Sequence, residues 1–276
     1  MKIITDTSAL YSPQEGRELG ITVIPACTLV NGKVYRDYED IGCEEFLKLI
    51  EEGAVPTSSQ PAIGEVMEIF EECREDILYL AIGDGLSGTF QNAVGARNCM
   101  EPNAHIHILD TRTLAGCQRY LVQKAMKLLD EGVRIEEIIR RIRDSIETSV
   151  SFVIPSDFDF LKRSGRLTPI AAKIGGVIKI VPVLTQTEDM RRIRPFAIKR
   201  SRKKAVEAIM EYLKDMGVGK DHVISIGHAG VYETAKEVFA QMRSQFSDAT
   251  MEILQLAPAL ITHGGPGCIT IQAIHK

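Results

Sequence analysis

Hydroxyl and glycine residues follow a short apolar run in the first third of the chain. The run Ile77–Ile82 is broken by Gly83-Asp84-Gly85, and Ser87, Gly88 and Thr89 come next. This order predicts a strand, a tight turn and a helix whose first turn contains those last three residues. The N–H groups of a first helical turn have no partner within the helix, and neighbouring hydroxyls can also donate hydrogen bonds. We therefore predict that this turn binds an oxyanion.

The same stretch matches the glycine pattern of dinucleotide-binding turns. Gly83-x-Gly85-x-x-Gly88 follows a predicted strand and precedes a predicted helix, and Asp110 closes the next strand. The pattern lies outside the first strand–helix unit of the chain, where this fingerprint usually occurs, and Asp84 places a carboxylate in the turn. An NAD-dependent oxidoreductase is therefore the alternative hypothesis, beside a purely structural turn.

Three further polar segments could contact an anion. The first is the loop Val55–Ala62, which contains Ser58. The second contains Arg166, which follows Gly165, and the third contains His263, which precedes the glycine-rich stretch Gly264–Gly267. A histidine on such a turn can donate or accept a proton. Each segment also has a structural interpretation, as a helix cap, as the basic end of a helix or as a tight turn. From the residues alone, the structural interpretation is favoured for the loop and for Arg166.

Composition narrows the class of protein. The chain has 276 residues, 45% of them hydrophobic and 25% charged, with a formal net charge of -4, which argues against nucleic-acid binding. It contains no secretory signal core and no apolar run of about eighteen residues, so we expect a cytoplasmic protein without stable membrane insertion.

The six cysteines form no C-x-x-C pair and are expected to be buried free thiols, and no metal site is expected. No nucleophile elbow, P-loop or zinc-protease motif occurs, so no catalytic residues are assigned.

The apolar patterns predict two α/β domains, at residues 1–148 and 149–276. In the first, strands alternate with helices, which favours a doubly wound, mainly parallel, Rossmann-like sheet. Its predicted strands include Lys2–Thr5, Thr22–Pro25 and His105–Leu109, and Asn31-Gly32 predicts a hairpin. In the second, the strand pattern from Val150 to Ile274 is more varied, and we expect a mixed sheet.

Taken together, these motifs resemble the DegV family over the whole chain. The resemblance rests on their order and spacing rather than on any one of them. The segments that carry it are Ile4–Ser8, Ser58–Ala62, Leu86–Ala93, Asp110-Thr111, Leu161–Leu167, Lys179–Leu184 and His263–Gly267.

The resemblance implies a carrier that holds one long-chain fatty acid between its two domains. In that family, hydroxyls that correspond to Ser58 and Ser87 bind the carboxylate, and the residues that correspond to Arg166 and His263 lie near it. Gly88, Thr89 and Gly264 belong to the same motifs and complete the predicted ligand-binding set. The family includes the FakB-type subunits of bacterial fatty acid kinase, whose kinase partner converts the carboxylate to an acyl phosphate. The resemblance therefore implies no enzymatic activity of this chain and no cofactor, and it leaves a transient membrane contact open.

The chain departs from the family pattern at three places. Gly83-Asp84 replaces two small hydroxyl residues, Ser58 stands where threonine is common, and Ser164 replaces a usual glycine. The first change creates the dinucleotide-like glycine pattern and places the Asp84 carboxylate where it would repel an anion if it faced the head group. The second change keeps the hydroxyl, and the third affects the local turn.

Overall fold

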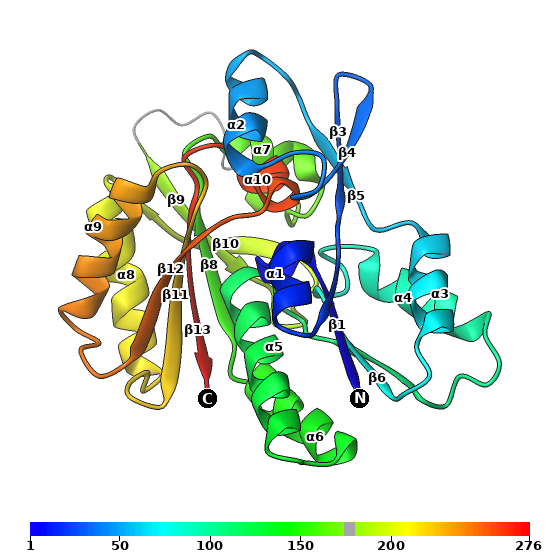
Figure 1. Cartoon of the computed structure of the whole chain (residues 1–276). Coiled ribbons are helices and arrows are strands. Elements are labelled where there is room, and N and C mark those ends of the chain that lie inside the picture. The colour runs from blue at the N-terminus through cyan, green and yellow to red at the C-terminus, as the bar shows by residue number, and fades with distance from the viewer. Residues whose placement is uncertain (174–179) are drawn as a thin grey trace. The chain divides into compact units, whose positions relative to one another are not determined.

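The computed structural model describes residues 1–173 and 180–276 (Figure 1). The chain divides into two compact units. Unit 1 consists of Met1–Glu147 and Ala257–Ala259, and unit 2 consists of Thr148–Leu256 and Leu260–Lys276. The domain boundary predicted after residue 148, and a ligand between the domains, stay predictions. Lys179, which opens one of the motifs above, lies outside the described residues.

Unit 1 is built on a parallel sheet with the strand order β2-β1-β6-β7. The strands are β1 (Lys2–Asp6), β2 (Thr22–Ile24), β6 (Ile77–Ala81) and β7 (Ile106–Asp110). All five residues of β6 are buried, as a central parallel strand requires. Val66 and Phe70 of α3 (Ile63–Glu72) pack with Tyr79 and with α4 (Thr89–Asn98) in one apolar core. The prediction of a parallel, doubly wound sheet is confirmed.

A small antiparallel sheet with the order β4-β3-β5 completes the strands of unit 1. Asn31 and Gly32 join β3 (Cys27–Val30) to β4 (Lys33–Arg36), and both have positive φ, as a tight hairpin turn requires. The sequence predicts a loop at 55–62, but Thr57–Ser59 forms β5 and pairs with β3. This prediction is wrong because the free edge of β3 supplies backbone partners that the local sequence does not reveal.

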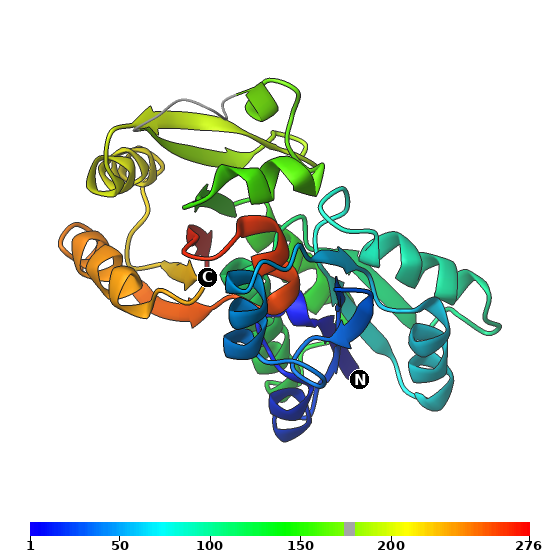
Figure 2. The same ribbon diagram turned by 90° about the horizontal axis from the view of Figure 1, so that it is seen from above.

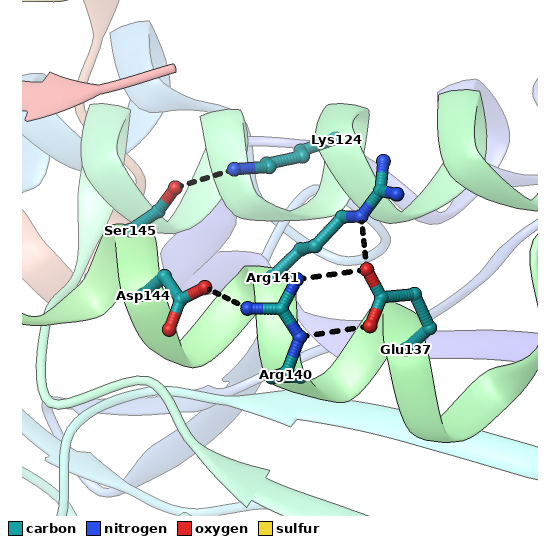
Figure 3. Close-up of polar contacts among 6 residues, drawn as sticks. All are labelled: Lys124, Glu137, Arg140, Arg141, Asp144 and Ser145. Carbon is teal, nitrogen blue, oxygen red and sulfur yellow. Dashed lines mark hydrogen bonds and ion pairs between the residues drawn. The ribbon is translucent and has the colours of Figure 1, made fainter.

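The remaining helices of unit 1 are α1 (Pro13–Glu18), α2 (Cys43–Glu51), α5 (Ala115–Asp130) and α6 (Ile135–Ile146), with a 3-10 turn η1 (Thr7–Ala9). Helix α6 buries Ile138, Ile142 and Ile146 on one face. On its polar face, the Glu137 carboxylate accepts hydrogen bonds from both Arg140 and Arg141 (Figure 3), at nitrogen–oxygen distances of 2.6 to 2.8 Å. Hydrogen bonds from these arginines lower the pKa of Glu137 to about 2. Arg140 and Arg141 are thus paired with neighbouring carboxylates.

Unit 2 contains a six-stranded mixed sheet with the order β10-β9-β8-β13-β11-β12. The strands are β8 (Val150–Ile154), β9 (Val181–Gln186), β10 (Ile193–Lys199), β11 (His222–His228), β12 (Thr250–Gln255) and β13 (Ile269–His275). The pairing of β11 with β12 is parallel, and the other pairings are antiparallel. Helices α8 (Arg202–Asp215) and α9 (Tyr232–Arg243), yellow and orange in Figure 2, pack on this sheet in a single apolar core. The predicted mixed sheet is confirmed.

Three short helical segments complete the described elements: α7 (Phe158–Ser164), η2 (Ala171–Lys173) and α10 (Pro258–Gly264). The first two lie in unit 2, and α10 belongs to it from Leu260 onward. The sequence predicts a glycine-rich turn from His263, whereas His263 and Gly264 form the end of α10 and the turn is confined to Gly265–Gly267. Pro258 opens this helix, where its fixed φ suits the first helical position.

The cysteine prediction holds only in part. Cys117 and Cys268 are buried, Cys27, Cys43 and Cys73 are half-buried, and Cys99 is exposed.

Candidate functional site

The predicted anion-binding turn joins β6 to α4 in unit 1. Ser87 is half-buried, and Thr89, the first residue of α4, is 3% exposed. The Ser87 and Thr89 hydroxyl oxygens lie 2.9 Å apart in hydrogen-bond contact, and the Thr89 N–H donates to Ser87 Oγ at 3.3 Å. Gly88 occupies the N-cap position and has no side chain to cover the helix end. Two hydroxyls and the N-terminal N–H groups of α4 thus lie together, as an oxyanion requires.

The loop that carries Ser58 meets this turn. A Cβ atom on Gly88 would lie 2.5 Å from Gln60 Oε1, and Asn92 Nδ2 donates to the Pro61 carbonyl at 2.9 Å. Ser58 is half-buried on β5, two residues before Gln60. The structure therefore brings the Ser58 segment and the Ser87 turn to the same end of α4. Gln60 and Asn92 hold these segments together. Gln60 lies within Ser58–Ala62, one of the segments that carry the family resemblance.

The three glycines of the dinucleotide-like pattern each have a structural reason. A Cβ atom on Gly83 would lie 2.9 Å from the Arg112 carbonyl carbon, Gly85 has a φ of 88°, and Gly88 packs against Gln60. Asp110 Oδ1 accepts hydrogen bonds from the N–H groups of Asp84 and Arg112, so its carboxylate braces the turn. These contacts explain the glycines without a bound dinucleotide, and nothing in the described structure favours the NAD alternative.

Asp84 is the residue whose carboxylate would repel an anionic head group if it faced that group. Its side chain is 9% exposed, and its Oδ2 accepts a hydrogen bond from Gln91 Nε2 at 3.1 Å. Gln91 lies in the first turn of α4. The Asp84 carboxylate is therefore directed to a partner on that helix, which reduces its repulsion of an anion at Ser87.

Arg166 and His263 lie close to each other in unit 2. Helix α7 ends at Ser164, and Gly165 follows with a φ of 72°. Ser164 Oγ donates to the Leu161 carbonyl and accepts from the Arg166 N–H, while the Arg166 guanidinium donates to the Ser164 carbonyl. Ser164, one of the departures from the family pattern, thus stabilises the turn that presents Arg166.

Burial sets the charge state of this pair. Burial, with a smaller contribution from the Arg166 guanidinium, lowers the pKa of His263 to about 4, so the imidazole is neutral near pH 7. Burial also lowers the pKa of Arg166, which still remains a cation at this pH. A half-buried cation beside a neutral imidazole suits an anionic ligand that also needs a hydrogen-bond donor.

Glycines allow α10 to approach its neighbours within unit 2. A Cβ atom on Gly264 would lie 2.9 Å from Cys268 Sγ, and one on Gly265 would lie 2.8 Å from the Phe160 ring of α7. Because α7 precedes Arg166 and α10 carries His263, this close packing brings the two segments near enough for the Arg166 charge to act on His263.

The seven predicted ligand-binding residues thus form two groups. Ser58, Ser87, Gly88 and Thr89 gather in unit 1, and Arg166, His263 and Gly264 gather in unit 2. Their roles in ligand binding stay predictions. Across residues 1–173 and 180–276, no group of three His, Cys, Asp or Glu side chains is arranged to hold a metal ion. Over the same ranges, no helix has the length and apolar character needed to span a bilayer.

Comparison with known proteins supports one family. Residues 1–276 match the family model described as "Uncharacterised protein, DegV family". A DegV domain-containing protein of Caldanaerobacter subterraneus subsp. tengcongensis is 31% identical over 268 residues, which cover 96% of this chain and 95% of the relative.

Two solved structures show the same fold. The crystal structure of DegV, a fatty acid binding protein from Bacillus subtilis, is 26% identical with a TM-score of 0.87 and covers 100% of this chain and 99% of its own. A fatty acid binding DegV family protein from Streptococcus agalactiae is also 26% identical, with a TM-score of 0.89 and coverages of 100% and 98%. The match over the full chain, in sequence and in fold, shows that this protein belongs to the DegV family.

Proposed function

We propose that this protein binds a long-chain fatty acid and that the Ser58, Ser87 and Thr89 hydroxyls hold its carboxylate. The observation that carries the proposal is the hydroxyl pair of Ser87 and Thr89 at the start of α4, with the Ser58 segment packed beside it. The descriptions of the Bacillus subtilis and Streptococcus agalactiae relatives as fatty acid binding proteins support the same ligand class.

The carboxylate and the acyl chain of the ligand should contribute differently to the binding free energy. A buried carboxylate is costly unless it is hydrogen-bonded, and hydroxyls together with helix N–H groups can meet that demand. Each such bond contributes about 1.5 to 3 kcal/mol. The acyl chain contributes about 0.8 kcal/mol per buried CH₂, before the cost of ordering it. The tail should therefore supply most of the affinity, and the hydroxyls should fix the orientation of the head group.

The protein acts in this proposal as a carrier rather than as an enzyme, and it needs no cofactor. It presents the bound acid to a partner fatty acid kinase in the cytoplasm, which converts the carboxylate to an acyl phosphate. Arg166 and His263 serve this step: the guanidinium offsets negative charge, and the neutral imidazole donates or accepts a hydrogen bond. The bacterial origin of the relatives is consistent with this role.

Mass spectrometry and a Ser87→Ala variant test the proposal. Purified protein should release a fatty acid on denaturation or take one up when it is added, and failure of both would refute fatty acid binding. Ser87→Ala should weaken binding about tenfold or more, because one hydrogen bond to a charged group is lost. Ser59→Ala is a matched control, since Ser59 is exposed on the same strand as Ser58. Unchanged affinity of a folded Ser87→Ala protein would remove Ser87 from the site.

A further inference from the structure

Thr28 carries a buried hydroxyl for which the fold of unit 1 supplies no hydrogen bond. The residue lies on β3 and is 0% exposed. Its Oγ1 atom has no hydrogen-bond partner among the residues that the structure describes. Such an atom is rare in folded proteins, because a hydroxyl removed from water without a partner is destabilising. A partner supplied by a ligand would remove this cost.

The strand register places this hydroxyl beside the candidate site. Thr28 is the direct cross-strand partner of Ser58 in the antiparallel pair of β3 and β5. Directly opposed residues point to the same face of a sheet, with Cβ atoms about 5 Å apart. That face is the buried one, because Leu29 on β3 is 43% exposed and both neighbours of Ser58 on β5 are exposed.

The segment that continues from Ser58 leads to the other hydroxyls of the site. Gln60 packs against Gly88, and the Pro61 carbonyl accepts from Asn92 at the start of α4. Thr28 thus adds a hydroxyl opposite Ser58, on the strand pair whose continuation adjoins the Ser87 turn. Its position on β3 explains why no motif in the sequence marks it, since the pairing of β3 with β5 is not local.

We propose that Thr28 is a further ligand-binding residue and that its hydroxyl donates a hydrogen bond to the carboxylate of the bound fatty acid. This inference rests on the proposed function and adds a residue to the same site. A threonine hydroxyl can donate one hydrogen bond, and a carboxylate offers about four acceptor positions, so Thr28 can bind together with Ser58 and Ser87 without competing with them.

The test uses stearate and its methyl ester as probes of the full-length protein. Thr28→Val keeps the shape of the side chain and removes the hydroxyl, and it should weaken stearate binding about tenfold or more. Thr28→Ser keeps the hydroxyl and should bind within about threefold of the unmodified protein. Thr28→Val should also reduce the preference for stearate over methyl stearate, which a merely structural effect would leave unchanged.

Tyr79→Phe provides the matched control. The Tyr79 hydroxyl is also buried without a hydrogen-bond partner in the described structure, but its ring packs in the apolar core with Phe70. This variant should bind stearate normally. If Thr28→Val does not fold, Thr28→Cys, whose thiol is a weak donor, carries the same prediction.

Two outcomes separate this inference from the proposed function. Normal stearate binding by Thr28→Val, alongside weakened binding by Ser87→Ala, would overturn the role of Thr28 and leave fatty acid binding intact. Absence of stearate binding by the unmodified protein, with no other fatty acid bound, would overturn both.

Discussion

The buried carboxyl group of Asp37 should make the stability of unit 1 depend on pH. Asp37 is 0% exposed, and its Oδ2 atom accepts hydrogen bonds from Thr7 Oγ1 at 3.2 Å and from the Ala259 N–H at 3.1 Å. Burial outweighs these bonds and, with a contribution from the Asp6 carboxylate, raises the pKa of Asp37 from 3.8 to about 7. The carboxyl group therefore keeps its proton in the folded protein at pH values where the unfolded chain has lost it.

The sign and size of the effect follow from this pKa. Below pH 3.8 the group is protonated in both states and costs nothing. As the pH rises to about 7, the folded state loses stability relative to the unfolded state, and above that pH the loss is constant. A pKa difference of about 3 corresponds to about 4 kcal/mol in total. About 3 kcal/mol of this loss falls between pH 5 and pH 8.

Asp37→Asn tests this reasoning because asparagine keeps the side-chain size and one acceptor oxygen but does not ionise. The free energy of unfolding of the variant, minus that of the unmodified protein, should increase by about 3 kcal/mol from pH 5 to pH 8. Urea unfolding followed by circular dichroism at several pH values measures this difference. Any constant cost of the substitution cancels, so the slope with pH is the informative quantity.

Asp189→Asn is the matched control for this experiment. A hydrogen bond from Thr187 Oγ1 lowers the pKa of Asp189 below 3.8, so the group is ionised in both states above pH 5. Its difference curve should be flat between pH 5 and pH 8. A flat curve for Asp37→Asn as well would show that Asp37 is ionised in the folded protein, and it would refute the account of its burial.

Two further predictions concern packing and the role of the unit 2 residues. Gly83→Ala should lower the free energy of unfolding by about 1 to 3 kcal/mol, because the added Cβ atom would press on the Arg112 backbone. Gly64→Ala is the control, since a Cβ atom at that position would meet no atom within 4 Å. An equal effect of the two substitutions in urea unfolding would contradict this account. Arg166→Ala and His263→Ala should impair phosphorylation by a partner kinase more than they impair fatty acid binding, as measured by acyl phosphate formation and by equilibrium binding of stearate. Equal losses in the two assays would contradict the proposed division of roles.

The sequence was informative where structure depends on near neighbours. The continuous apolar run of β6 is typical of a buried strand, and Gly83 and Gly85 follow it. Asn31-Gly32 predicts a hairpin because both residues tolerate the positive φ that its tight turn requires. The spacing of Ile138, Ile142 and Ile146 also predicts a helix, and these residues lie on the buried face of α6. In these elements, local preference and burial point to the same structure.

The sequence was misleading where a distant partner decides the local conformation. Thr57–Ser59 reads as a polar loop, and it becomes a strand only because the edge of β3 pairs with it. The sequence predicts a glycine-rich turn from His263, yet His263 and Gly264 form the end of helix α10, and Gly264 packs on Cys268.

The sequence by itself thus determined the α/β class, the parallel and mixed sheets and the hydroxyl-rich turn at Ser87, because these depend on local patterns of polarity and backbone preference. Only the tertiary structure decided that the Ser58 segment adjoins Gly88, that Arg166 lies near His263 and that Thr28 opposes Ser58. The physical reason is that these contacts join residues far apart in the chain. Their formation depends on strand pairing and close packing, which no local pattern of residues encodes.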